Sequence, residues 1–164
     1  MRLKSSIMRL MLDTNVWLNY FLREEGTHRD CEQLLEAAVT HDTALLVSPT
    51  TLKDVFYLIP RRFRRQDALD GKPLVSYAPA AWACLDFMLE IATPSPISFA
   101  ECTFARSLKA RFGDFEDNLL LASAETADVD YIVTYDKPLL KQFPEVFVTP
   151  KRALELLNMQ EQSV

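Results

Sequence analysis

Residues 10–15 read Leu10-Met11-Leu12-Asp13-Thr14-Asn15, an apolar triplet that runs directly into an acid and two polar residues. Such a triplet indicates a short buried strand that ends at Asp13. The runs Ala44–Val47 and Tyr131–Thr134 have the same character, and the second is followed closely by Asp136. Because helical patterns separate these runs, the sequence predicts an α/β fold with a mostly parallel sheet that helices cover on both faces.

Apolar spacing and capping residues predict the remaining elements. Ser48 and Pro49 form a good helix start, and Pro60 is expected to end that helix. Residues 61–78 are expected to form a loop or a helix extension, and the whole chain, 1–164, is expected to be one domain. Further helices are expected over Val16–Leu22, Thr27–Ala38, Pro79–Ile91, Phe99–Phe112, Phe115–Ala127 and Pro150–Leu157, and short strands at Ile97 and Val146–Val148.

The composition excludes several kinds of functional site. The chain has 164 residues with 18 Lys and Arg against 23 Asp and Glu, and this net charge of −5 argues against simple polycationic nucleic-acid binding. Its three glycines lie too far apart to build a glycine-rich phosphate loop. Two histidines, and three cysteines without a C-x-x-C pair, exclude a histidine-rich metal site, a cysteine zinc site and a redox pair.

The sequence also indicates where the protein resides. It has no run of about 18 apolar residues, so no membrane-spanning segment is expected. The apolar stretch near its start is too short for the core of an export signal, and no small-residue cleavage site follows it. Few cysteines, odd in number, suit a reducing compartment. A cytoplasmic protein is therefore expected.

Acidic residues from distant parts of the chain are expected to meet at one edge of the sheet. Asp13 and Asp136 follow predicted strands. Asp54, Asp114 and Asp117 lie at or near the starts of predicted helices. Strand ends and helix starts share one edge of a parallel α/β sheet, so these acids can converge there. Each acid taken alone also has an ordinary explanation as a turn residue, a helix cap or a solvated residue.

Carboxylates that converge repel one another. Two like charges about 4 Å apart cost about 4 kcal/mol at an effective dielectric constant of about 20. The cluster must therefore take up protons or bind a cation, and oxygen ligands without Cys or His select Mg²⁺ or Mn²⁺. A metal held in this way can bind a phosphodiester, activate a water and stabilise the leaving oxygen. Glu116, in the first turn of its helix, is expected to be solvated instead.

Four motifs, in their order along the chain, resemble those of the PIN-domain family of metal-dependent ribonucleases. They are Met11–Asn15, Val47–Asp54, Asp114–Leu119 with Ala122–Ala124 after it, and Tyr131–Asp136. Order and spacing agree over roughly residues 8–150. The resemblance implies a three-layer α/β/α sandwich with a mostly parallel sheet and an acidic pocket for Mg²⁺ or Mn²⁺.

The resemblance also implies roles for individual residues. Asp114 is expected to be an accessory metal ligand or a helix cap. Asp54 is shorter by a methylene group than the Glu that the family usually has, so its contact with the metal is expected to be direct or through water. Tyr135 stands where the family more often has a small, polar or basic residue. The implied catalytic acids are Asp13, Asp54, Asp117 and Asp136, the metal ligands Asp13, Asp114, Asp117 and Asp136, and the supporting residues Thr14, Asn15 and Thr134.

Small bacterial members of the family are commonly VapC-like toxins, which cut RNA and are neutralised by a small antitoxin. By this resemblance the chain is expected to be a Mg²⁺- or Mn²⁺-dependent endoribonuclease, the toxin of a type II toxin–antitoxin pair, and a homodimer. One alternative is a catalytically inactive PIN-fold module that binds RNA or protein, which the short Asp54 favours. Another is a metal-dependent phosphatase of a different α/β class, but the Asp13–Asn15 stretch lacks the second Asp that one large class uses.

Two groups of residues have more than one interpretation. Four arginines in five positions follow the helix that carries Asp54, and they are Arg61, Arg62, Arg64 and Arg65. These arginines form either a patch that grips phosphates or an acidic partner, or a solvated helix end whose charges suit the helix dipole. The second group consists of aromatic residues that either line a groove for a second copy or an antitoxin, or pack in the core; they are Trp17, Phe21, Phe56 and Tyr57.

Overall fold

The computed structural model describes residues 7–41 and 43–161. The expectation that the first residues carry no export signal concerns mainly residues 1–6, which lie outside the described part. In the described part of the chain, five parallel strands form one sheet in the order β3-β2-β1-β4-β5, so β1 is central. The strands are β1 (Arg9–Leu12), β2 (Ala44–Val47), β3 (Thr93–Pro94), β4 (Tyr131–Val133) and β5 (Phe147–Val148).

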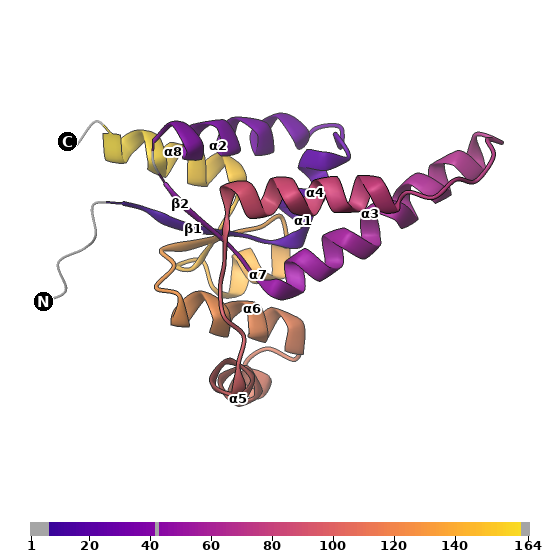
Figure 1. Cartoon of the computed structure of the whole chain (residues 1–164). Helices are drawn as coiled ribbons and strands as arrows, with labels where there is room; N and C mark the ends of the chain where they lie inside the picture. The colour runs from indigo at the N-terminus through magenta and orange to yellow at the C-terminus, as the bar shows by residue number, and fades with distance from the viewer. Residues whose placement is uncertain (1–6, 42, 162–164) are drawn as a thin grey trace, which may run out of the picture.

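Helices cover both faces of this sheet, which confirms the predicted three-layer α/β/α sandwich (Figure 1). One layer contains α1 (Thr14–Phe21), α2 (His28–Thr40), α3 (Pro49–Leu69), α4 (Ala78–Ile91) and α8 (Pro150–Glu161). The other contains α5 (Phe99–Ser107), the short 3-10 helix η1 (Leu108–Ala110), α6 (Phe115–Thr126) and α7 (Lys137–Gln142). Within the described part of the chain, no helix is long and apolar enough to cross a membrane.

The central strand explains why the apolar triplet decides the fold. Leu10 and Leu12 pack in the core on the α1–α2 side, while Met11 packs with Leu120 of α6 and Ile132 of β4 on the other side. Successive side chains of a strand point to opposite faces, so a strand buried on both faces reads as an uninterrupted apolar run. The three residues of the triplet are completely buried.

The prediction that Pro60 ends its helix is wrong, because α3 continues to Leu69; of the two forms expected for residues 61–78, the helix extension is the one found over 61–69. A proline inside a helix costs about 3 kcal/mol through the missing N–H and a steric clash. Packing between α3 and α4 offsets this cost: the rings of Phe63 and Tyr77 lie 5.1 Å apart, and Tyr77 donates a hydrogen bond to Asp67. As a result, the paired helices form an arm that projects from the sheet (Figure 1).

Three further expectations differ from the structure. The short strand expected at Ile97 lies instead at β3, where Pro94 is tolerated because β3 is an edge strand of the sheet. The helix expected to reach Phe112 ends at Ser107 and gives way to η1. The six-residue helix α7 was not expected at all. The other predicted strands and helices are confirmed with small shifts of their ends.

Candidate active site

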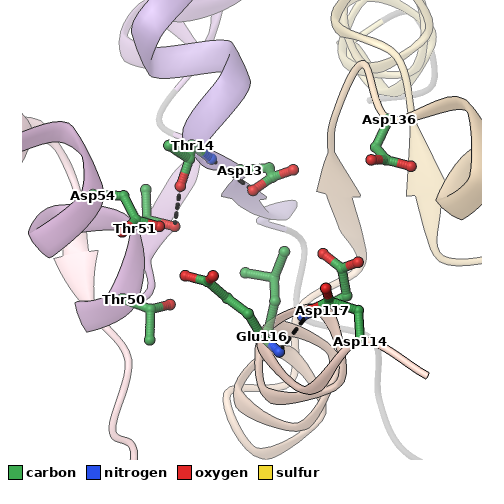
Figure 2. A pocket seen from close by; sticks show the side chains of 10 residues that line it. Asp13, Thr14, Thr50, Thr51, Asp54, Asp114, Glu116, Asp117 and Asp136 are labelled. Atoms are coloured by element: carbon green, nitrogen blue, oxygen red, sulfur yellow. Dashed lines mark hydrogen bonds between the residues drawn. The ribbon is translucent and has the colours of Figure 1, made fainter. Parts of the chain in front are cut away.

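The acids expected to converge do lie together, around a cavity of about 290 Å³ at the carboxyl ends of β1 and β4 (Figure 2). Its walls come from four separate stretches of the chain, namely the starts of α1, α3, α6 and α7. The lining residues are Asp13, Thr14, Thr50, Thr51, Asp54, Asp114, Glu116, Asp117, Leu120 and Asp136. All of them except Leu120 are polar or charged, so the cavity suits a polar or ionic ligand.

Asp13 is held in place by hydrogen bonds. It follows β1 and caps α1, and its Oδ1 accepts a hydrogen bond of 2.6 Å from the backbone N–H of Thr14. Its Oδ2 accepts hydrogen bonds from Asn15 Nδ2 at 2.9 Å and from Thr134 Oγ1 at 2.8 Å. Burial raises the pKa of Asp13, and these hydrogen bonds oppose that rise.

Asn15 and Thr134 lie behind the cavity rather than in its lining. Asn15 Nδ2 also donates to Thr134 Oγ1 at 2.9 Å, and Asn15 Oδ1 accepts from the backbone N–H of Tyr135 at 3.0 Å. Thr134 Oγ1 in turn accepts from the backbone N–H of Asp136 at 3.0 Å. This network ties the end of β1 to the end of β4, so the positions of Asp13 and Asp136 are fixed relative to each other.

Tyr135, the residue that departs from the family pattern, points away from the cavity. Its hydroxyl lies 3.6 Å from the sulfur of Cys31 and donates to the carbonyl oxygen of Thr27 at 3.3 Å. Both partners belong to the start of α2, so the side chain links the β4–α7 connection to that helix. The departure therefore leaves the acidic cavity unchanged.

The start of α6 contributes the most strongly perturbed acid. Asp114 caps the helix by accepting from the backbone N–H groups of Glu116 and Asp117, at 2.9 Å and 3.2 Å. The pKa of Asp117 is raised to about 7, chiefly by burial and then by the negative charges of Asp114, Asp13, Asp136 and Glu116. Asp114 thus has its expected capping role and also lines the cavity.

Asp54 and Glu116 form the opposite wall. Glu116 is exposed, as expected, and it also lines the cavity; a hydrogen bond with Asp54 is the main cause of its raised pKa. Lys53 Nζ lies 2.9 Å from Asp54 Oδ1 and 3.8 Å from Glu116 Oε1. Glu116 directly precedes Asp117 at a helix start, and this adjacency is the signal by which the sequence could have included it.

The four arginines are not part of the cavity wall. All lie exposed on α3 beyond Asp54, and Arg62 Nη1 is 3.8 Å from Glu24 Oε1. Of the aromatic candidates, Trp17 is fully buried and Phe21 packs against the same core. Tyr57, in contrast, is 59% exposed.

The donor set suits a hard divalent cation. As the side chains stand, no three Asp, Glu, His or Cys residues of the described chain are grouped tightly enough to hold a metal ion. The cavity nevertheless offers carboxylate oxygens, and the pKa values of Asp13, Asp117 and Glu116 are all raised. A divalent cation would offset both the burial of these carboxylates and their mutual repulsion, and oxygen ligands of this kind fit Mg²⁺ or Mn²⁺.

The chain is similar in fold to several solved toxin–antitoxin structures. One is the crystal structure of VapBC2 from Rickettsia felis bound to a DNA fragment from its promoter (15% identity, TM-score 0.60, 87% of this chain and 98% of that chain). Another is a toxin–antitoxin complex from Klebsiella pneumoniae (19% identity, TM-score 0.58, 86% and 97%). A third is VapBC-1 from nontypeable Haemophilus influenzae (13% identity, TM-score 0.56, 87% and 98%).

The sequence itself matches a known family. No curated protein shows a significant match to the chain. A sequence model of the PIN domain, however, matches residues 9–138, which is well over half of the chain. This range includes the central strand and all the acids of the cavity. The chain therefore belongs to the PIN domain family.

Proposed function

We propose that this protein is a metal-dependent endoribonuclease that hydrolyses RNA phosphodiester bonds. The observation that carries the proposal is the convergence of carboxylates from four separate stretches of the chain on one polar cavity. The raised pKa values of Asp13 and Asp117 support it, because such a cluster favours a bound cation. Membership of the PIN domain family, which is generally a nuclease family, supports it further.

Each residue has a role in this proposal. Asp13, Asp117 and Asp136 would hold Mg²⁺ or Mn²⁺, with Asp114 as an accessory ligand and Asp54 completing the site. When bound, such a cation lowers the pKa of a coordinated water and stabilises the negative charge of the leaving oxygen. The chain's own polar groups prepare the site, because Asn15, Thr134 and the backbone N–H of Thr14 hold the Asp13 carboxylate in one orientation.

The test is cleavage of end-labelled RNA in Mn²⁺, compared between the wild type and Asp13→Asn. We expect the variant to lose more than about 100-fold in rate, since even the partners that only orient a ligand contribute about 10- to 100-fold. Asp86→Asn, on an exposed part of α4, is the matched control and should cleave at the wild-type rate. Equal rates for Asp13→Asn and the wild type would refute the assignment.

We also propose that the protein is the cytoplasmic toxin of a type II pair, in which a small antitoxin binds it. The solved structures that it resembles are toxin–antitoxin complexes. A second cavity, about 350 Å³ between α1, α2 and α4, is lined by the aromatic side chains of Tyr20, Phe21 and Phe87 and by the polar side chains of Arg23, His28 and Glu32, so it suits an amphipathic segment of such a partner. Co-purification with the product of a small adjacent reading frame tests this proposal. Phe87→Glu should abolish that capture, and a melting curve checks that the variant is folded, because Phe87 also packs against the core.

An exposed apolar surface on α4 is the basis for proposing a homodimer. Trp82 and Leu89 lie on one side of α4 and are 57% and 47% exposed, and the Trp82 ring packs 4.9 Å from that of Phe56. We propose that a second copy of the chain covers this surface. We also propose that residues 1–164 form one PIN-like domain. Sedimentation of the wild type should show a dimer and that of Trp82→Ser a monomer, and a monomeric wild type would overturn the dimer.

One observation favours a second candidate function, a catalytically inactive PIN-fold module that binds RNA or protein. Asp54 is short, and the ammonium group of Lys53 already lies 2.9 Å from it. This ion pair offsets the negative charge on the Asp54 side of the cavity without a metal. Metal binding or RNA binding without any RNA cleavage would support this module over the enzyme.

A further inference from the structure

The helix α3 connects the acidic cavity to the arginine-rich arm. Asp54 lies in the cavity wall, and the helix runs on without interruption to Leu69. At about 100° of rotation per residue, Arg61 and Arg65 lie within about 20° of the direction of Asp54. They are about 10 Å and about 16 Å farther along the helix axis. These two arginines therefore continue the line that begins at the cavity, while Arg62 and Arg64 lie about 80° to either side.

This side of α3 faces solvent. Val55 and Ile59, about 100° and about 140° around the helix from Asp54, are completely buried, whereas Arg61 and Arg65 are exposed. Arg62 has Glu24 as an acidic neighbour at 3.8 Å. For Arg61 and Arg65 the described part of the chain provides no carboxylate within ion-pair distance. Arg65 lines a cavity of about 430 Å³ together with Arg62 and Glu24, but within the described chain neither Arg61 nor Arg65 forms an ion pair, so both guanidinium groups are available to an external anion.

An aromatic ring lies between the cavity and the two arginines. Tyr57, three residues beyond Asp54, is 59% exposed, and its ring is supported by Phe56 at a centroid distance of 5.3 Å. Exposed aromatic rings beside cationic side chains are typical of surfaces that bind single-stranded nucleic acid, because bases stack on the rings while phosphates meet the cations. This combination favours RNA over an acidic protein as the ligand.

The acidic cavity cannot by itself attract a polyanion. We propose that Arg61 and Arg65 bind successive phosphates of a single-stranded RNA whose reacting phosphodiester lies at the cavity, with Tyr57 stacking on an intervening base. The inference rests on the proposed ribonuclease function and adds the path of the substrate. The strand would run outward along the exposed side of α3, over the projecting arm seen in Figure 1.

The test compares two double variants with the same change in charge, Arg61→Gln/Arg65→Gln and Arg62→Gln/Arg64→Gln. Both are made in the Asp13→Asn background, so that RNA stays intact during the measurement. The Kd for a fluorescein-labelled single-stranded oligouridylate is measured by anisotropy over a range of salt concentrations. Melting curves confirm that both double variants are folded, and a double-stranded RNA serves as a second probe.

The first double variant is expected to weaken single-strand binding about tenfold at physiological salt and to lower the salt slope by about 1.4, because each phosphate contact on a single strand contributes about 0.7. The second is expected to change Kd by less than about threefold, because its arginines would contact no phosphate. Equal losses for the two double variants, unchanged binding in the first, or a preference for double-stranded RNA would overturn the path. Cleavage by the wild type, which retains Asp13, is scored separately, so a failed path is distinguishable from a failed ribonuclease assignment.

Discussion

Replacing Asp117 by Asn should stabilise the metal-free protein near neutral pH. The pKa of this carboxyl is raised from 3.8 to about 7 by burial and by the neighbouring acids. A pKa difference of about 3 corresponds to about 4 kcal/mol. Because the group is only half-buried, solvent screening reduces this to about 2 kcal/mol. The substitution removes the charge that the folded state tolerates poorly, so the free energy of unfolding rises by that amount.

The pH dependence of the free energy of unfolding shows whether the Asp117 carboxyl stabilises or destabilises the folded state. At about pH 3 and below, the carboxyl is protonated in the folded and the unfolded states and costs nothing. As the pH rises toward about 7, the unfolded chain releases this proton before the folded protein does, so the folded state is progressively destabilised. The Asp117→Asn variant lacks this effect, since an amide does not titrate. The difference in stability between the variant and the wild type therefore grows with pH and levels off above about pH 7.

Thermal melts in EDTA measure the effect. At about pH 8 the Asp117→Asn variant should melt about 6 °C above the wild type, and at about pH 3 the two should nearly coincide. Asp86→Asn is the control for removing an exposed charge and should melt with the wild type. If the Asp117→Asn variant melts below the wild type in EDTA at about pH 8, the reasoning from burial and carboxylate repulsion is wrong.

Three further predictions concern metal binding. Adding Mn²⁺ at about 100 times its Kd should raise the free energy of unfolding of the wild type by about 2.7 kcal/mol, whereas Asp13→Asn should show no rise in melting temperature. Thr134→Val removes the hydroxyl that donates to Asp13 Oδ2, so calorimetry should show a metal Kd raised about 10- to 100-fold, and an unchanged Kd would mean that this hydrogen bond does not orient the ligand. Glu116→Gln removes the carboxylate that faces Asp54 and should raise the metal Kd by up to about tenfold. An unchanged Kd would mean that Glu116 lines the cavity without contributing to metal binding.

The fold was predictable from local sequence because its central strands are buried on both faces. Parallel strands in this position read as continuous apolar runs, and the predicted bounds of Ala44–Val47 agree with β2. Helix starts were also readable, since Ser48 and Asp114 both cap helices with their side chains. These are signals that a few neighbouring residues carry on their own.

The sequence left open whether residues 61–78 form a loop or a helix extension, because a distant contact decides between the two. Pro60 carries a strong local signal for the end of a helix, yet Phe63 and Tyr77, from α3 and the residue that begins α4, hold the extension in place. A window of neighbouring residues does not contain this pairing. The two-residue strand β3 is likewise too short to have a pattern of its own.

The acids of the cavity also differ in how far the sequence predicts their positions. Asp13 and Asp136 were predictable because the topology of a parallel sheet places strand ends at one edge. For Glu116 the sequence offers only its adjacency to Asp117 at a helix start, since the side it faces depends on how the start of α6 packs opposite α3. Its hydrogen bond with Asp54 joins residues far apart in the sequence.

The most direct test of the proposed metal site is a crystal structure of the wild type soaked in Mn²⁺, with data collected for anomalous scattering. We expect an anomalous peak inside the acidic cavity, with oxygens of Asp13, Asp117 and Asp136 at about 2.1 Å, the distance typical of a small hard divalent cation. An Asp13→Asn crystal treated identically should lack this peak. An empty cavity at saturating Mn²⁺, or a peak that avoids Asp13 and Asp117, would contradict the assignment of this cavity as a metal-dependent active site.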